Sequence, residues 1–248
     1  QMCIRDRALA APMTEREFAE HIAGLASLNK IYTSYIGMGW YDTITPAVIQ
    51  RNVFENPAWY TSYTPYQTEV SQGRLEALLN FQTVISDLTA MPLANCSLLD
   101  EATAAAEAAT MMYGLRSRDQ QKKGTNVLFV DESIFPQNLA VIQTRVIPQG
   151  MKIQVGNYKE LEFTPEIFAC IIQYPNASGS VEDYREFVEK AHAANCKVAV
   201  DADILSLALL LPPGEWGADI VFGSTQRLGI PLFLSLIHIS EPTRLALI

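Results

Sequence analysis

The chain has few histidines, scattered cysteines and no long hydrophobic run, and each shortage argues against a class of function. Only three of its 248 residues are histidine, so a histidine metal site or a Ser-His-Asp triad has little to draw on. The four cysteines follow no Cys-x-x-Cys spacing, which argues against a zinc site or a disulfide framework. We therefore expect no metal site, and we expect any catalysis to depend on a cofactor.

Positive charge is also sparse. The formal net charge is −9, and basic residues form no run beyond Lys122-Lys123, so a phosphate backbone is a poor partner. No apolar stretch approaches the roughly 20 residues of a membrane-spanning helix, and the first residues lack the apolar core of a secretion signal. These features predict no nucleic-acid partner, no membrane partner and a cytoplasmic location, or the mitochondrial matrix if the source is eukaryotic.

An alternation of apolar segments and helical patterns predicts the fold class. Five strands are expected between residues 126 and 224, in the runs NVLFVD, MKIQVG, IFACIIQYP, KVAVDAD and ADIVFGS. Helical spacing of apolar residues separates some of them, over 135–146 and 181–195. Continuous apolar strands that alternate with helices predict an α/β domain, with a mostly parallel sheet covered by helices on both faces.

Two further helices are expected before the first strand. Residues 73–88 carry a leucine-rich stripe. A second, alanine-rich helix follows, and we expect Ser97 to open it, with Asp100 three residues on as in a capping box. Residues 35–73 instead concentrate Tyr, Trp, Pro and Gly without sustained periodicity, which predicts an ordered, irregular arm.

Three motifs, in this order and at this separation, resemble one enzyme family. They are YTPYQTEVSQGRLEALLNFQ, SLLDEATAAAEA and PPGEWGADIVFGSTQRLGIP. Together they make residues 14–233 similar to the N-terminal half of glycine decarboxylase, the P-protein of the glycine cleavage system. The resemblance implies the type I fold of pyridoxal-phosphate enzymes, in two related halves that are fused or separate. It also implies an oxidoreductase that decarboxylates glycine and passes the aminomethyl group to the lipoyl arm of H-protein.

The resemblance gives a meaning to the turn after the last expected strand. In the half that binds the cofactor, a lysine in this turn forms the imine with pyridoxal phosphate, and its position falls on Gln226. A carboxamide nitrogen is not nucleophilic and cannot form that imine. Residues 198–248 contain no lysine that could replace it. We therefore expect no catalytic residue and no bound cofactor in this half, with pyridoxal phosphate in the partner half.

Other positions of the cofactor site are expected to be vestigial. The helix near Ser97 corresponds to the one that holds the cofactor phosphate in active relatives, but Asp100 and Glu101 follow. Two carboxylates there either repel a dianion or simply cap the helix, and both interpretations predict an empty phosphate site. Asp201 or Asp203 falls where the fold places the aspartate for the pyridine nitrogen, and is interpreted here as a relic or a helix cap.

The resemblance also implies that the irregular arm contributes to an active site shared by the two halves. N-terminal segments of type I enzymes reach across to the partner, and our candidates for facing glycine or the lipoyl arm are Tyr63, Thr64, Tyr66 and Gln67. The alternative is an arm that only holds the halves together. The expected partners are the lysine-bearing half, lipoylated H-protein and glycine.

The two ends depart from the family pattern. Residues 1–7 and 234–248 resemble translated sequencing-adapter sequence of the kind found on environmental gene fragments. Between them we expect an N-terminal helix and aromatic arm over 8–72 and a truncated large α/β domain over 73–233. Such a piece is expected to be inactive alone.

Two other functions stay open at this stage. A stand-alone type I pyridoxal-phosphate enzyme would require a lysine near residue 226. A non-catalytic, doubly wound nucleotide-binding module would want a glycine-rich turn after the first strand, and residues 131–138 contain no glycine.

Overall fold

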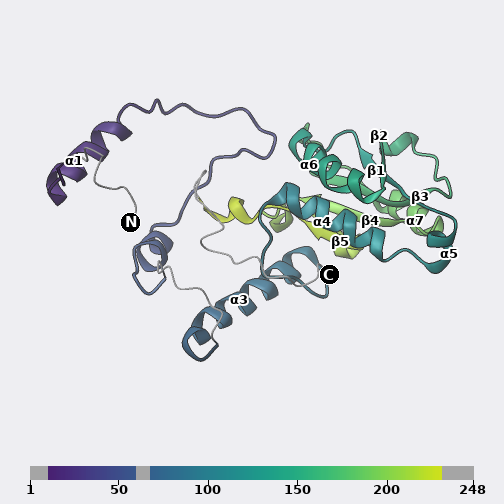
Figure 1. Ribbon diagram of the computed structural model, residues 1–248, viewed down its shortest axis with the longest axis horizontal. Coiled ribbons are helices and arrows are strands. Elements are labelled where there is room, and N and C mark those ends of the chain that lie inside the picture. Colours follow the sequence, from purple (N-terminus) through teal and green to yellow (C-terminus); the bar gives the residue numbers. More distant parts are fainter. Residues whose placement is uncertain (1–10, 60–67, 231–248) are drawn as a thin grey trace, which may run out of the picture. The chain divides into compact units, whose positions relative to one another are not determined.

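The computed structural model describes residues 11–59 and 68–230, and the chain divides into two compact units, Gln1–Tyr35 and Ile36–Ile248 (Figure 1). The described part of the first unit, residues 11–35, contains the helix α1 (Glu15–Ala26), a turn after it and residues without regular secondary structure. A capping box starts α1, because Thr14 accepts the N–H of Glu17 and the Glu17 carboxylate accepts the N–H of Thr14. No residue of α1 is buried, so its apolar side chains are exposed.

The second unit contains a five-stranded, fully parallel sheet of order β2-β1-β3-β4-β5. The strands are β1 (Val127–Asp131), β2 (Lys152–Gly156), β3 (Ile167–Tyr174), β4 (Lys197–Ala202) and β5 (Ile220–Phe222). Every residue of β1 and β3 is buried, as the continuous apolar runs predict for central strands. The expected number, position and parallel direction of the strands are confirmed.

Helices cover both faces of this sheet, as predicted. The helices of the unit are α2 (Ala47–Ile49), which continues into a π-helical turn (Gln50–Phe54), α3 (Thr68–Thr89), α4 (Glu101–Gly114), α5 (Arg118–Lys122), α6 (Pro136–Val146) and α7 (Arg185–Ala193). Leu128 and Val130 of β1 belong to the core cluster of α4 and α6, whereas Phe129 between them belongs to the cluster of α7. This alternation shows that α4 and α6 cover one face and α7 the other.

The alanine run of α4 serves close packing. Ala105, Ala108 and Ala109 are fully buried, and α4 lies against α6 and the sheet. Small side chains let two helix backbones approach closely, so the run needs no catalytic explanation.

Three expected helix starts are wrong. The leucine-rich helix begins at Thr68 instead of residue 73, within the segment expected to be irregular. The predicted helix over 181–195 begins only at Arg185, because the Asp183 carboxylate accepts the Arg185 N–H, and Val181 is exposed instead of packed on the apolar face. The alanine-rich helix begins at Glu101, and its cap is Asp100, whose carboxylate accepts the Thr103 N–H at 2.6 Å. Ser97 lies too far upstream to cap it, and its hydroxyl donates to the Leu98 carbonyl.

Within the part of the chain that the structure describes, no helix is long and apolar enough to cross a membrane. The three cysteines in that part, Cys96, Cys170 and Cys196, are all free thiols. Burial raises the pKa of Cys170 and Cys196, which keeps these thiols protonated and unreactive.

Candidate functional site

The carboxyl ends of β4 and β5 bring together the positions singled out in the sequence. Asp201 lies near the end of β4 and is 2% exposed, and Asp203 follows that strand. Gln226 lies in a 3-10 turn, Thr225–Leu228, directly after β5. Ser97 lines a small cavity of about 130 Å³ at this edge, together with residues of the β5 turn. The four candidates therefore share one edge of the sheet.

The Gln226 side chain is used by its own turn. Its amide nitrogen donates to the Ile230 carbonyl at 2.7 Å, while its backbone N–H donates to the Ser224 hydroxyl. The side chain is half-buried and its donor group is occupied. Gln226 thus closes the turn in which the resemblance expects a lysine.

A buried amide joins two carboxyl groups at the same edge. The nitrogen of the Asn138 side chain, on the first turns of α6, lies 2.6 Å from Asp201 Oδ2 and 2.8 Å from Glu101 Oε1. Asn138 is 1% exposed, so this contact links α4, α6 and β4 inside the protein. Sequence reasoning missed Asn138, whose only signal is a polar residue two positions after the Pro136 that starts α6.

The pKa of both carboxyl groups of this network is raised. The pKa of Asp201 lies well above its usual range because the group is buried and faces Glu101. The pKa of Glu101 is also raised, first by burial and then by the negative charges of Asp203 and Asp100. Two acids on one amide titrate as a pair, so the network holds a proton more readily than either acid would in water.

The N-terminus of α4 is already occupied by carboxylates. Asp100 accepts the Thr103 N–H, and Glu101 is the first residue of the helix. Free N–H groups at a helix start are what bind a phosphate, and the positive end of the helix dipole supports that binding. Here Asp100 already accepts the Thr103 N–H, and a dianion would meet the carboxyl groups of Asp100 and Glu101.

An N-terminal segment is anchored at the same edge. The Thr43 hydroxyl donates to the Ile230 carbonyl at 3.0 Å, and the Thr45 hydroxyl donates to the Gly229 carbonyl at 2.5 Å. Arg227 lies over the Tyr41 ring, 4.5 Å from its centre. We call residues 37–46 the strap, since they hold the turn after β5 from outside.

The strap also reaches α6. The Gln137 side chain donates to the Met38 carbonyl at 2.8 Å, and a Cβ on Gly39 would meet the Phe135 ring at 3.1 Å. Met38 has a left-handed backbone, which is uncommon for a residue with a side chain and occurs mainly where the surroundings enforce it. The residues of the arm that were predicted to face glycine or the lipoyl arm, Tyr63, Thr64, Tyr66 and Gln67, lie outside the described residues.

Comparison with known structures first defines the class. The cysteine desulfurase CsdA of Escherichia coli superposes with a TM-score of 0.54 over 77% of this chain and 51% of its own, at 14% identity. That likeness concerns the fold alone, and together with the parallel sheet it places the chain in the type I fold of pyridoxal-phosphate enzymes.

The family follows from closer matches. Residues 2–235 match the family described as "Glycine cleavage system P-protein", and the chain belongs to this family. A solved glycine decarboxylase (P-protein) of the glycine cleavage system, in inhibitor-bound form, has a TM-score of 0.79 and 32% identity, covering 94% of this chain and 53% of its own. A "Glycine dehydrogenase (decarboxylating)" of Bacteroides fragilis is 79% identical over 91% of this chain. The chain spans about a quarter of that relative, 24% of its length.

Proposed function

We propose that this chain is the part of a glycine decarboxylase that lacks the reactive lysine, and that it works only with a lysine-bearing half. The complete enzyme would decarboxylate glycine and pass the aminomethyl group to the lipoyl arm of H-protein, an oxidoreductase reaction located in the cytoplasm or in the mitochondrial matrix. The observation that carries the proposal is Gln226, an amide bonded to its own turn where the family's fold needs an amine.

The residues at this edge do not fit a resident pyridoxal phosphate. Gln226 offers no nucleophile. Asp100 and Glu101 stand at the helix start where a phosphate would need free N–H groups, and Glu101 is also bonded to Asn138. The buried acid Asp201 would suit a pyridine nitrogen, but it faces Asn138 and Glu101 instead. No chemical step is therefore assigned to this half.

Its residues would instead shape the partner's active site. The Asn138 network ties α4, α6 and β4 together, and the strap covers the turn after β5, so this edge is a fixed surface. Tyr63, Thr64, Tyr66 and Gln67 are the proposed contacts with glycine or the lipoyl arm, because they carry hydroxyl and amide groups between the strap and α3. Ser97, Asp201, Asp203 and Gln226 are proposed to be vestigial.

The test is to look for a cofactor imine on each half separately. The purified chain is mixed with pyridoxal phosphate, its visible spectrum is recorded, and any imine is reduced with borohydride and located by mass spectrometry. We expect no adduct that depends on the folded state, with the urea-unfolded chain as control for surface lysines. The lysine-bearing half, treated in the same way, should show the imine band.

Activity then tests the pairing. Carbon dioxide release from carboxyl-labelled glycine, with lipoylated H-protein present, should require both halves together. A specific adduct inside the folded chain, or release of carbon dioxide by the chain alone, would refute the proposal.

A further inference from the structure

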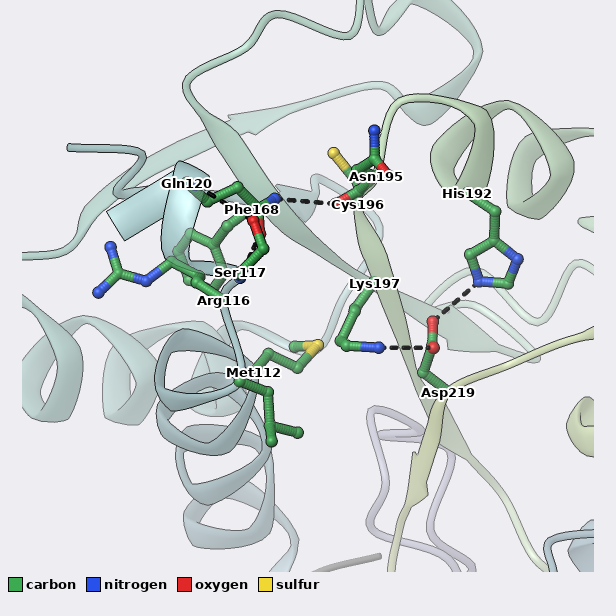
Figure 2. A pocket seen from close by; sticks show the side chains of 11 residues that line it. Met112, Arg116, Ser117, Gln120, Phe168, His192, Asn195, Cys196, Lys197 and Asp219 are labelled. Atoms are coloured by element: carbon green, nitrogen blue, oxygen red, sulfur yellow. Dashed lines mark hydrogen bonds and ion pairs between the residues drawn. The ribbon is translucent and has the colours of Figure 1, made fainter. Parts of the chain in front are cut away.

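A second cavity in the described residues lies at the opposite edge of the sheet from the Asp201 network. Its volume is about 410 Å³, and it opens where β3 and β4 begin and just before β5 (Figure 2). Its lining includes Met112, Arg116, Phe168, His192, Lys197 and Asp219. Lys197 is the first residue of β4, whereas Asp201 lies near its end, so this amino-edge cavity is separate from the vestigial site.

The floor of the amino-edge cavity is apolar. Met112 and Phe168 are 1% and 2% exposed, and Phe168 packs edge-on against Tyr113. Small-molecule sites usually have volumes of about 300–1,000 Å³ and combine such a floor with a few fixed polar groups. The cavity falls within that range of size, and Met112, Leu115 and Phe168 supply the apolar part of a lining that is otherwise mostly polar.

One wall carries a fixed group of charges. Lys197 Nζ lies 3.2 Å from Asp219 Oδ1, and His192 Nε2 lies 2.9 Å from Asp219 Oδ2. Figure 2 shows Lys197 and His192 converging on this carboxylate, with Lys197 on the side of Met112. The Val198 N–H also donates to Asp219 at 2.8 Å. An ammonium has three N–H donors, so Lys197 keeps donors for a further acceptor.

Asp219 stays ionised and keeps this wall in place. Burial alone would raise its pKa, but the hydrogen bonds from Val198 and His192 and the charge of Lys197 outweigh it, and the pKa is lowered. An ionised Asp219 therefore pairs with the Lys197 ammonium at the cavity wall before any ligand arrives.

A second cation, Arg116, lines the cavity, and the groups that it contacts are neutral. The Arg116 guanidinium stacks over the Tyr113 ring at 3.3 Å, and it donates to the carbonyl oxygens of Tyr113 and Thr125. The two positive charges of Arg116 and Lys197 and the negative charge of Asp219 give the cavity lining a net charge of about +1 when His192 is neutral. This local excess occurs in a chain whose formal net charge is −9.

We propose that the amino-edge cavity binds a small organic carboxylate. The ligand's carboxylate would accept from Lys197 under the field of Arg116, and its apolar part would lie on Met112 and Phe168. One surplus positive charge matches a monoanion better than a phosphate dianion. The competing explanation is that these cations only offset the C-terminal dipoles of α4 and α7, which end at this edge.

Three probes of one size but different charge separate these explanations. Benzoate, benzyl alcohol and benzylammonium are titrated into the chain labelled with ¹³C at the methionine methyl groups, and the Met112 signal is assigned with Met112→Leu. Benzoate should shift the Met112 signal saturably and bind about tenfold more tightly than the alcohol, because it adds a charge-assisted hydrogen bond. Benzylammonium should give no saturable shift. Phenyl phosphate, titrated as a fourth probe, should bind more weakly than benzoate.

Variants then test the proposed anchor. Lys197→Met should weaken benzoate binding by about tenfold or more, and Lys197→Arg should keep it within about threefold, because charge and donors are retained. Lys190→Met is the matched control, since Lys190 lies on the exposed face of α7 and pairs with Glu186. It should leave benzoate binding unchanged.

Several results would overturn the proposal. These are no saturable shift with benzoate, equal affinity for the three probes, or unchanged benzoate binding in a folded Lys197→Met. The probe series on the unmodified chain decides the matter even if that variant does not fold.

Discussion

The amide nitrogen of Asn138 lies 2.6 Å from the carboxylate of Asp201, and both residues are buried. A buried carboxyl group without a hydrogen-bond partner costs free energy of folding, so the Asn138 amide stabilises Asp201 by donating a hydrogen bond to it. The same nitrogen contacts Glu101, so one side chain determines how three elements meet at the carboxyl edge of the sheet.

The first prediction concerns Asn138 itself. Asn138→Ala removes the donor shared by the buried Asp201 and the partly buried Glu101, and should lower the free energy of unfolding by about 2–4 kcal/mol, as measured by urea denaturation. Asn126→Ala removes one exposed amide that donates to the Gly150 carbonyl, and should cost about 1 kcal/mol or less. Equal losses in the two variants would mean that the Asn138 network contributes nothing special.

The second prediction is a fall in stability as pH rises. Glu101 and Asp201 have ordinary pKa values of 4.5 and 3.8, and burial raises both in the folded chain. Above the ordinary values the folded state therefore holds protons that the unfolded state has lost. This contribution to stability is fully present below those values and is lost as pH rises through the raised ones.

Glu101→Gln should flatten this dependence. The variant removes one titrating group and the repulsion it exerts on Asp201, so at pH 8 it should be more stable than the unmodified chain. The expected gain in the free energy of unfolding is about 1.4 kcal/mol for each pKa unit by which the folded-state pKa of the removed group exceeds its unfolded-state pKa. Unfolding is followed by denaturation between about pH 4 and pH 8. Glu162→Gln, at an exposed carboxylate, controls for net charge. An unchanged slope in Glu101→Gln would show that the pair does not share a proton.

The third prediction distinguishes the two candidate caps of α4. Asp100→Ala should lower the free energy of unfolding by about 1 kcal/mol, because the Thr103 N–H loses its acceptor. Asp100→Ser should restore most of that loss. Ser97→Ala should change stability by less than about 0.5 kcal/mol, since the Ser97 hydroxyl bonds only the neighbouring carbonyl. Thermal unfolding of the three variants decides whether Ser97, as the sequence predicts, or Asp100, as the structure shows, caps α4.

The fourth prediction asks whether lysine alone would restore a cofactor site. Gln226→Lys supplies an amine, but Asp100 and Glu101 still stand where a phosphate would bind. We expect no visible imine band beyond that of the unmodified chain at equal pyridoxal phosphate. Gln226→Met controls for loss of the hydrogen bond to Ile230. A saturable band in Gln226→Lys would leave the missing amine as the sole defect of the site.

The sheet could be predicted from sequence because its strands are short, its central strands β1 and β3 are buried throughout, and helical patterns separate several of the strands. The edge that carries Asp201 and Asp203 followed from the same pattern, since parallel strands end together. Asn138 could not be predicted, because its contacts with Glu101 and Asp201 span 37 and 63 residues of sequence and leave no local pattern. The cap of α4 was misplaced because a serine three residues before an acid imitates a capping box.

The hydrogen bonds of the strap can form only late in the synthesis of the chain. Its two threonine hydroxyls bond to residues 184 and 187 positions later, so nothing made earlier can satisfy them in this way. At a synthesis rate of about 5–20 residues per second, the ribosome needs roughly 10 to 40 seconds to bridge that separation. Throughout that interval the Thr43 and Thr45 hydroxyls lack these two acceptors, and the contacts can form only after Gly229 and Ile230 have left the exit tunnel.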